Sequence, residues 1–310
     1  MTGVSVVIPA YNAAHYIGAT LDSVLAQQTA RSVECIVVDD GSQDDTVPRV
    51  RAYGERVTLI QQSNAGPSSA RNRGLAASAF PLVAFIDADD LMAPQRLELQ
   101  ATALEADPAT VLCHSACQLI DAQGLAVDNQ DPVGDDPSFS GEVCARLFCA
   151  NFVWLSSVML RKQAFMDAGA FDTGLRHCED YEAWLRLSLR GRFKYLAQTL
   201  VSYRLHPQQA TRQAARLNVG RVQARELFLG KCPAARDALG ARFIGQTFAR
   251  VALDLGYASL RAGDLPAARW ILRRGLAHSP ASAPLAATLA KSYLPGFLRR
   301  GLGRGGTPWP

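Results

Sequence analysis

The sequence predicts an α/β domain followed by a region made only of helices. Two observations carry this prediction. Four short apolar runs alternate with helical patterns over residues 4–86, and only helical patterns follow His206. Strands that alternate with helices indicate a parallel sheet. The charge changes at the same place, because residues 1–206 carry 24 Asp and Glu against 16 Lys and Arg, whereas residues 207–310 carry 4 against 16.

The four predicted strands are short and rich in β-branched residues. They are 4–9, 35–39, 57–61 and 82–86, and the first is expected to stop at Pro9. Between the first two strands, apolar residues at 17, 21, 24 and 25 share one helical face, and Asn12 is expected to cap that helix. Ser42 and Asp45 have the spacing of a capping box for the next helix, which is predicted to reach about Gly54.

The second half of the α/β region mixes further strands and helices. A helix is predicted over 94–105, and strands are predicted over 110–119 and 154–160. Residues 128–141 are rich in turn formers and are interpreted as a surface loop, with a lid over a ligand site as the alternative. Glu179 and Asp180 open a further amphipathic helix, whose exposed N–H groups favour negative charge.

The most informative stretch is Val83–Asp90, where a buried strand runs into Asp87, Asp89 and Asp90. Ionised carboxylates are costly to desolvate, so they need a partner or water. A hard divalent cation would supply one, and Mg²⁺ is usually held by one or two carboxylates together with substrate phosphates. On its own such a turn is more often a solvated strand end. Polar side chains are expected at all four strand ends, however, and ligands of open α/β sheets bind there.

Several function classes are disfavoured. No G-x-G-x-x-G follows the first strand, which argues against a dinucleotide-binding domain. The seven cysteines lack metal-finger spacing, and Cys113 and Cys117 around His114 are interpreted as structural thiols. No apolar run approaches the roughly 18–20 residues that span a bilayer, and the N-terminus lacks a secretory signal pattern, so a cytoplasmic protein is expected. Few aromatic platforms and no recognised motif argue against nucleic-acid binding.

The helical region 207–310 contains one helical hairpin, over about 249–282, with tetratricopeptide-type spacing. Its basic tail, 299–306, is predicted to be disordered. Two interpretations of the positive charge stay open. The region could hold the protein on an anionic membrane, or it could cover the acidic first domain and offset its charge.

Five motifs in order carry a resemblance to a known family. They are Ser5–Asn12, Val37–Ser42, Asn64–Asn72 with Gly66 and Arg71, Asp87–Asp90, and Glu179–Asp180. Together they resemble family 2 glycosyltransferases, which are inverting enzymes with the GT-A fold, a nucleotide-binding mixed sheet flanked by helices. The resemblance covers about residues 3–206 and leaves the helical region without an expectation.

The resemblance implies transfer of a sugar from a nucleotide-sugar donor, most often UDP-linked, to a hydroxyl of a saccharide or lipid-linked acceptor in polysaccharide or glycolipid biosynthesis. It assigns the role of general base to Asp180. It also implies that Asp40 accepts a hydrogen bond from an N–H of the nucleobase. It implies that Asp89 binds Mn²⁺ or Mg²⁺ and that Asp87 faces the ribose or the metal. His206 matches a histidine that completes the metal site in some members, although a capping or core histidine is equally expected before Pro207. The residues that would line the nucleoside pocket are Pro9, Tyr11, Asp39 and Arg71.

The chemistry explains these residue types. A metal neutralises the charge that develops on the departing diphosphate, and a base must reach the acceptor hydroxyl. A nucleotidyltransferase is the alternative enzyme class, but such enzymes usually carry a glycine-rich basic loop near the N-terminus, and Pro9–Asn12 is not one. A non-catalytic scaffold that acts through the helical region is the other alternative.

Overall fold

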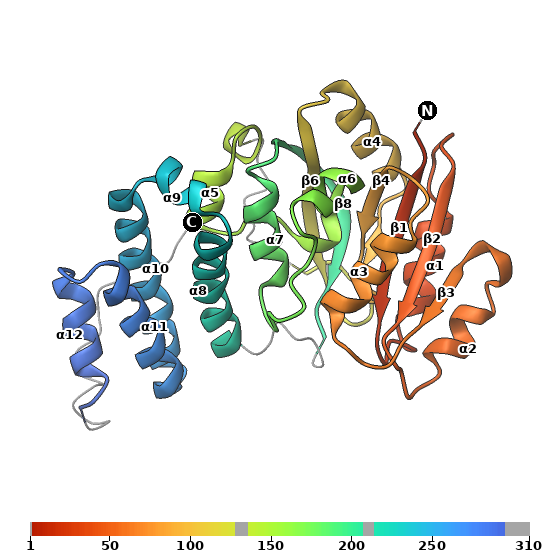
Figure 1. Ribbon diagram of the computed structural model, residues 1–310. Helices are drawn as coiled ribbons and strands as arrows, with labels where there is room; N and C mark the ends of the chain where they lie inside the picture. The colour runs from red at the N-terminus through yellow and green to blue at the C-terminus, as the bar shows by residue number, and fades with distance from the viewer. Residues whose placement is uncertain (1, 128–135, 207–213, 295–310) are drawn as a thin grey trace. The chain divides into compact units, whose positions relative to one another are not determined.

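The computed structural model describes residues 2–127, 136–206 and 214–294 (Figure 1). The chain divides into two compact units, Met1–Pro207 and Gln208–Pro310, which are described separately. Most of the predicted loop 128–141 and all of the predicted tail 299–306 lie outside the described residues.

The first unit is built on one mixed sheet, as predicted for a GT-A fold. Its strands, in the order in which they lie side by side, are β3 (Thr58–Gln61), β2 (Val33–Asp39), β1 (Val4–Ala10), β4 (Leu82–Phe85), β7 (Met159–Arg161), β6 (Thr110–Ile120), β8 (Arg192–Arg204) and β5 (Leu91–Met92). The four predicted strands are the parallel neighbours β3, β2, β1 and β4. Strand β7 pairs antiparallel with β4 and β6, which makes the sheet mixed.

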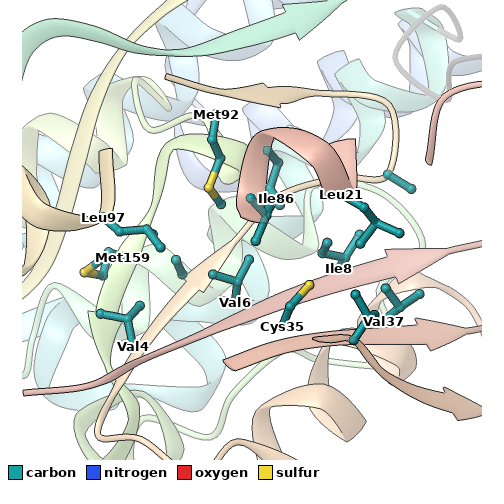
Figure 2. Packing of buried hydrophobic residues seen from close by; sticks show 14 of the residues in the cluster. Val4, Val6, Ile8, Leu21, Cys35, Val37, Ile86, Met92, Leu97 and Met159 are labelled. Atoms are coloured by element: carbon teal, nitrogen blue, oxygen red, sulfur yellow. The ribbon is translucent and has the colours of Figure 1, made fainter. Parts of the chain in front are cut away.

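Helices cover both faces of this sheet (Figure 1). Those of the first unit are α1 (Ile17–Leu25), α2 (Thr46–Arg51), α3 (Pro67–Ala77), α4 (Arg96–Ala106), α5 (Cys144–Cys149), α6 (Lys162–Asp167) and α7 (Glu179–Leu187). Helices α1 and α4 share one hydrophobic core with alternate residues of β1, namely Val4, Val6 and Ile8. Figure 2 shows these three side chains pointing the same way, toward Leu21 and Leu97. The period of two along β1 therefore assigns one of its faces to these helices.

The opposite face of β1 and β2 packs against α3. The side chain of Val7 leaves so little room that a Cβ added to Gly74 would lie 2.4 Å from its Cγ1. This close approach matters for function, because α3 also carries Arg71, and its position fixes where that side chain reaches the edge of the sheet.

We expect Gly74→Ala to lower the free energy of unfolding by about 1–3 kcal/mol, because the added methyl group overpacks the contact with Val7. The matched control is Gly18→Ala in α1, where the nearest atom would lie at an ordinary 3.7 Å. There the gain in helix propensity should raise stability by up to about 1 kcal/mol. Urea unfolding of both variants measures the difference, and equal stabilities would contradict the tight packing of α3.

Three local predictions are wrong. Asn12 does not cap α1, since it has a left-handed φ of 48° and its side chain accepts a hydrogen bond from the backbone N–H of Gln43. The capping box of Ser42 and Asp45 does not form, and Asp44 instead accepts the N–H of Thr46. Much of the strand predicted over 154–160 is a short 3-10 helix, Leu155–Ser157, before β7 begins at Met159. In the first two cases a competing side-chain hydrogen bond outweighs the local pattern.

The second unit is helical throughout its described residues. Its helices are α8 (Ala214–Lys231), α9 (Pro233–Leu239), α10 (Ala241–Arg261), α11 (Leu265–His278) and α12 (Ala283–Lys291). Helices α10 and α11 pack tightly, because a Cβ added to Gly275 would lie 2.4 Å from the Cβ of Ala252. The rings of Phe248 and His278 also stack with centroids 3.7 Å apart. The tetratricopeptide-type assignment of this hairpin stays a prediction. Among the described residues of either unit, no helix combines the length and the apolar character needed to cross a bilayer.

Candidate active site

The acidic turn after β4 lies where the sequence places it, at the carboxyl end of a buried strand. Asp87 lies two residues after the end of the strand, and its backbone N–H donates to the Ser156 hydroxyl at 3.1 Å. Asp90 does not start a helix, because α4 begins only at Arg96. Instead Asp90 is completely buried, and its Oδ1 accepts the backbone N–H of Arg204 at 2.9 Å. Burial raises the pKa of Asp90 well above its usual value, and Asp89 and Asp87 raise it further.

Asp89 meets His206, which follows the last long strand of the unit. The Asp89 Oδ2 and His206 Nε2 atoms lie 2.8 Å apart, although the two residues are 117 positions apart in the chain. Burial and the nearby charge of Asp87 raise the pKa of Asp89, against the opposing effect of the imidazole. The ring of Tyr16 packs on His206 with centroids 4.9 Å apart, and the Arg204 Nε donates to the Asp89 carbonyl oxygen at 2.8 Å. The structure thus brings together two of the three predicted metal ligands.

The third, Asp87, is paired with Arg71 rather than with His206. Arg71 is nearly buried, and its two terminal nitrogens donate to different carboxylates: Nη2 to Asp87 Oδ1 at 2.8 Å, and Nη1 to Glu179 Oε1 at 2.9 Å. Burial alone would lower the pKa of Arg71, but the two carboxylates raise it. Among the described residues no cluster of three His, Cys, Asp or Glu side chains is arranged to hold a metal ion.

Asp180, the predicted base, is the second residue of α7. Its pKa is raised to about 7, chiefly by burial; the charges of Glu179 and Asp87 act in the same direction, whereas the Tyr181 N–H and Arg71 lower it. Asp180 is still partly exposed to solvent, so its carboxylate is partly but not completely desolvated. A carboxylate with a pKa near neutrality is poised to exchange a proton at physiological pH.

An aromatic cluster fixes the start of α7 relative to β4. Trp184 of α7 packs against Phe165 and Phe171 with centroids 5.7 Å apart in both cases, and Phe171 packs against Phe85 of β4 at 5.3 Å. Such rings bury a large apolar area and pack with defined geometry. The helix that carries Asp180 is therefore anchored to the strand that carries the acidic turn.

The remaining predicted residues lie at the ends of β1 and β2. Asp40 is almost buried, and it accepts the backbone N–H groups of Ala65 and Gly66 at 2.9 and 2.8 Å, together with the Gln62 amide at 2.8 Å. This carboxylate therefore shapes the loop that leads into α3. The Asp39 side chain accepts the backbone N–H of Ser42 at 3.3 Å. Pro9 is half-buried within β1, which continues one residue past the predicted end, and Tyr11 is half-exposed.

Sequence reasoning missed the contacts of three residues of this site. Glu179 was recognised as part of a motif but not as the partner of Arg71. Ser156 supports Asp87, and Tyr16 packs on His206. For Glu179 the signal was its place beside Asp180, whereas nothing in the local sequence marks Ser156 or Tyr16.

Comparison with known proteins agrees with this geometry. The model of the family named glycosyl transferase family 2 matches residues 5–123. An uncharacterized glycosyltransferase of Rickettsia typhi is 30% identical over 218 residues, which make up 68% of this chain and 66% of that protein. The chain thus spans just under two thirds of that relative's length. The chondroitin synthase of Escherichia coli is 29% identical over 207 residues, 66% of this chain and 29% of that protein.

Two solved structures share the fold. The mannosyltransferase PcManGT of Pyrobaculum calidifontis, in complex with GDP-Man and Mn²⁺, superposes with a TM-score of 0.62 at 21% identity and covers 93% of this chain and 79% of its own. S. aureus TarS 1–349 in complex with UDP-GlcNAc gives a TM-score of 0.57 at 17% identity and covers 87% of this chain and 90% of its own. Since the motifs, the sheet and the relatives agree, residues 5–123 belong to a glycosyltransferase family 2 domain, and the first unit that contains them has the GT-A fold.

Proposed function

We propose that the protein is a metal-dependent inverting glycosyltransferase, which moves a sugar from a UDP-linked donor to an acceptor hydroxyl. The observation that carries this proposal is the Arg71 bridge. It joins the acidic turn, through Asp87, to the residue next to Asp180, through Glu179. A cation-binding turn and a base with a pKa of about 7 thus belong to one network at one edge of the sheet.

The metal would be held by Asp89 and His206, with Asp87 beside them. The donor set fits Mn²⁺ or Mg²⁺, because carboxylate oxygens suit these hard ions and imidazole also ligates transition metals. The raised pKa of Asp89 is a second sign of fit, since a cation would relieve the repulsion between neighbouring carboxylates. When bound, the ion would neutralise charge on the leaving diphosphate. The PcManGT complex with GDP-Man and Mn²⁺ supports a bound cation and a nucleotide-sugar donor by analogy.

The nucleoside would lie over the ends of β1 and β2. Pro9 and Tyr11 would contact the nucleobase, and Asp39 and Asp40 would line the nucleoside pocket. Oδ2 of Asp40 accepts one protein hydrogen bond, from Gly66, which leaves it capacity for a base N–H. The TarS complex with UDP-GlcNAc supports a UDP-linked donor.

Asp180 would accept the proton of the acceptor hydroxyl as that oxygen attacks the sugar. A single base and one displacement invert the anomeric configuration, whereas a retaining reaction needs a second carboxylate as nucleophile. The bond between the sugar and the diphosphate breaks as the new glycosidic bond forms, so the products are a glycosylated acceptor and a nucleoside diphosphate.

A thermal-shift screen of nucleotide sugars, with and without Mn²⁺, tests this proposal. A UDP-sugar should raise the melting temperature, and Mn²⁺ should increase that shift. Product analysis then separates the enzyme classes, since transfer releases UDP, whereas a nucleotidyltransferase releases pyrophosphate. Pyrophosphate release, or stabilisation by no nucleotide sugar, would reject the proposal.

We expect kcat/KM to rise about tenfold per pH unit below about 7 and to level off above it. The sign follows from the base, because only the deprotonated Asp180 can accept a proton, and burial with neighbouring charge raises its pKa to about 7. Initial rates from about pH 5.5 to 9 measure the profile. A rate that falls as the pH rises through 7 would contradict the assignment.

A cytoplasmic location at the membrane surface, with a lipid-linked or saccharide acceptor of polysaccharide or glycolipid synthesis, is a further part of the proposal. It is supported by the excess of basic residues in 207–310, of which many are exposed. These include Arg221, Lys231, Arg236, Arg242, Arg250, Arg261, Arg273 and Arg274. Anionic lipid attracts such clusters. Equal co-sedimentation with neutral and anionic vesicles would remove this part.

A further inference from the structure

Arg71 holds two carboxylates that come from distant parts of the first unit. Asp87 lies two residues after the end of β4, and Glu179 begins α7. The side chain of Glu179 is only 13% exposed and that of Arg71 only 6%, so solvent screens the pair weakly. Guanidinium nitrogens present a fixed fork, and here each terminal nitrogen serves a different element.

Glu179 is poorly placed to be only a helix-dipole residue. The preceding residue, Cys178, has a left-handed φ of 61°, so the chain turns sharply into α7. The carboxylate then points back to α3, where Arg71 also lies beside the Phe171 ring at 5.7 Å. The bridge therefore ties α3, the acidic turn and the first turn of α7 into one assembly.

We propose that Glu179 is a positioning residue, which acts through Arg71 to hold Asp180 at a fixed place relative to the donor-side carboxylate Asp87. This inference rests on the proposed function, because it assigns Asp180 as the base. Asp180 is the next residue along the chain, so tethering Glu179 limits how far the base can move. A displacement of about 1 Å at a reacting group can cost on the order of a hundredfold in rate.

The same geometry predicts which kinetic constant changes. When Glu179 is shortened, Arg71 keeps its bond to Asp87, so the carboxylate next to the proposed donor stays paired. The start of α7, which carries Asp180, loses its bond to Arg71. We therefore expect Glu179→Ala to lower kcat about 10–100-fold while the KM for the donor changes less than about threefold.

The first unit contains a matched control bridge far from the acidic turn. Arg31 pairs with Glu98 at 3.2 Å and Glu105 at 2.7 Å, and its side chain is 3% exposed. It too is a nearly buried arginine shared by two carboxylates, but it lies beside Thr2 at the start of the unit. Glu98→Ala removes one arm of this bridge and should leave kcat within about twofold of the wild type.

Glu179→Asp separates tethering from helix-dipole compensation. It keeps a negative charge in the first turn of α7 but shortens the reach to Arg71 by one methylene. We expect its kcat to fall as well, by about 5–20-fold, which also covers the case in which Glu179→Ala fails to fold.

The experiment measures kcat, donor KM and melting temperature for the full chain and the three variants, with a UDP-sugar that the wild type uses. A wild-type kcat in Glu179→Asp, or losses in Glu179→Ala no larger than in Glu98→Ala, would overturn the inference while leaving the proposed function intact. A wild type that transfers no sugar from any nucleotide donor would overturn the proposed function, and the inference with it.

Discussion

Asp180→Asn is expected to reduce sugar transfer about 10³-fold and to leave donor binding unchanged. Asparagine has nearly the same shape but cannot accept the proton of the acceptor hydroxyl, and a positioned base contributes about 10²–10⁴-fold in rate. The metal and nucleoside contacts proposed for the donor involve other residues. Steady-state transfer and equilibrium binding of the UDP-sugar, both in the presence of Mn²⁺, measure the two effects separately. Undiminished turnover in this variant would reject Asp180 as the base.

The same substitution has a second, independent consequence for stability. The folded protein raises the pKa of Asp180 from 3.8 to about 7, so the charged form is disfavoured in the folded state. This penalty is absent below about pH 4, grows between pH 4 and 7, and is complete above pH 7. Asp180→Asn should therefore melt several degrees above the wild type at pH 8 and at the same temperature near pH 4. A variant that is more stable yet inactive shows that the loss of transfer does not come from unfolding.

The sheet could be predicted from the sequence because its signal is local. Residues Val4–Ile8 and Ile36–Val38 form short β-branched runs, and the parallel order follows from their alternation with helices. The acidic turn was predictable for the same reason, since Asp87 and Asp89 lie within four residues of the end of a buried strand. Position at the strand ends was enough to place most of the candidate residues at one edge.

The contacts that organise the site could not be predicted, because they join residues far apart in the chain. Arg71 meets Glu179 across 108 positions, and Asp89 meets His206 across 117. The pattern around Glu179 shows only an acidic helix start, which helix-dipole compensation explains equally well. Nor does any pattern show that Asp90 would be buried as the acceptor for the Arg204 N–H. These pairings depend on where β8 and α7 lie relative to the acidic turn 87–90, which the local sequence does not show.

Asp40 shows a related limit of sequence reasoning. Its place after β2 predicts a ligand contact, and this stays a prediction. The structure adds that the carboxylate also holds the loop before α3 through Ala65 and Gly66. Since α3 carries Arg71, a change at Asp40 would disturb both the proposed nucleoside contact and the Arg71 bridge. Asp40 is therefore a poor residue for testing donor binding alone.

Asp89 offers the cleaner test of the donor side, and Asp89→Asn should reduce transfer at least about 10²-fold. The amide keeps the shape of the side chain and an oxygen, but it removes the charge that would hold the cation. The added stabilisation that Mn²⁺ gives to the UDP-sugar complex should disappear in the same variant. His206→Ala should lose less, about tenfold, because Asp89 and the diphosphate would still hold the ion. Transfer rates and melting temperatures with and without Mn²⁺ measure both variants.

The pKa of Asp89 makes this result interpretable. Burial and Asp87 raise that pKa, so the charge of Asp89 costs folding free energy at neutral pH. Removing the charge also relieves the repulsion on Asp90, which is completely buried nearby. The ligand-free Asp89→Asn protein should therefore be at least as stable as the wild type. A variant that keeps its stability but loses both transfer and the response to Mn²⁺ would locate the ion at Asp89, whereas an unchanged response to Mn²⁺ would place the ion elsewhere.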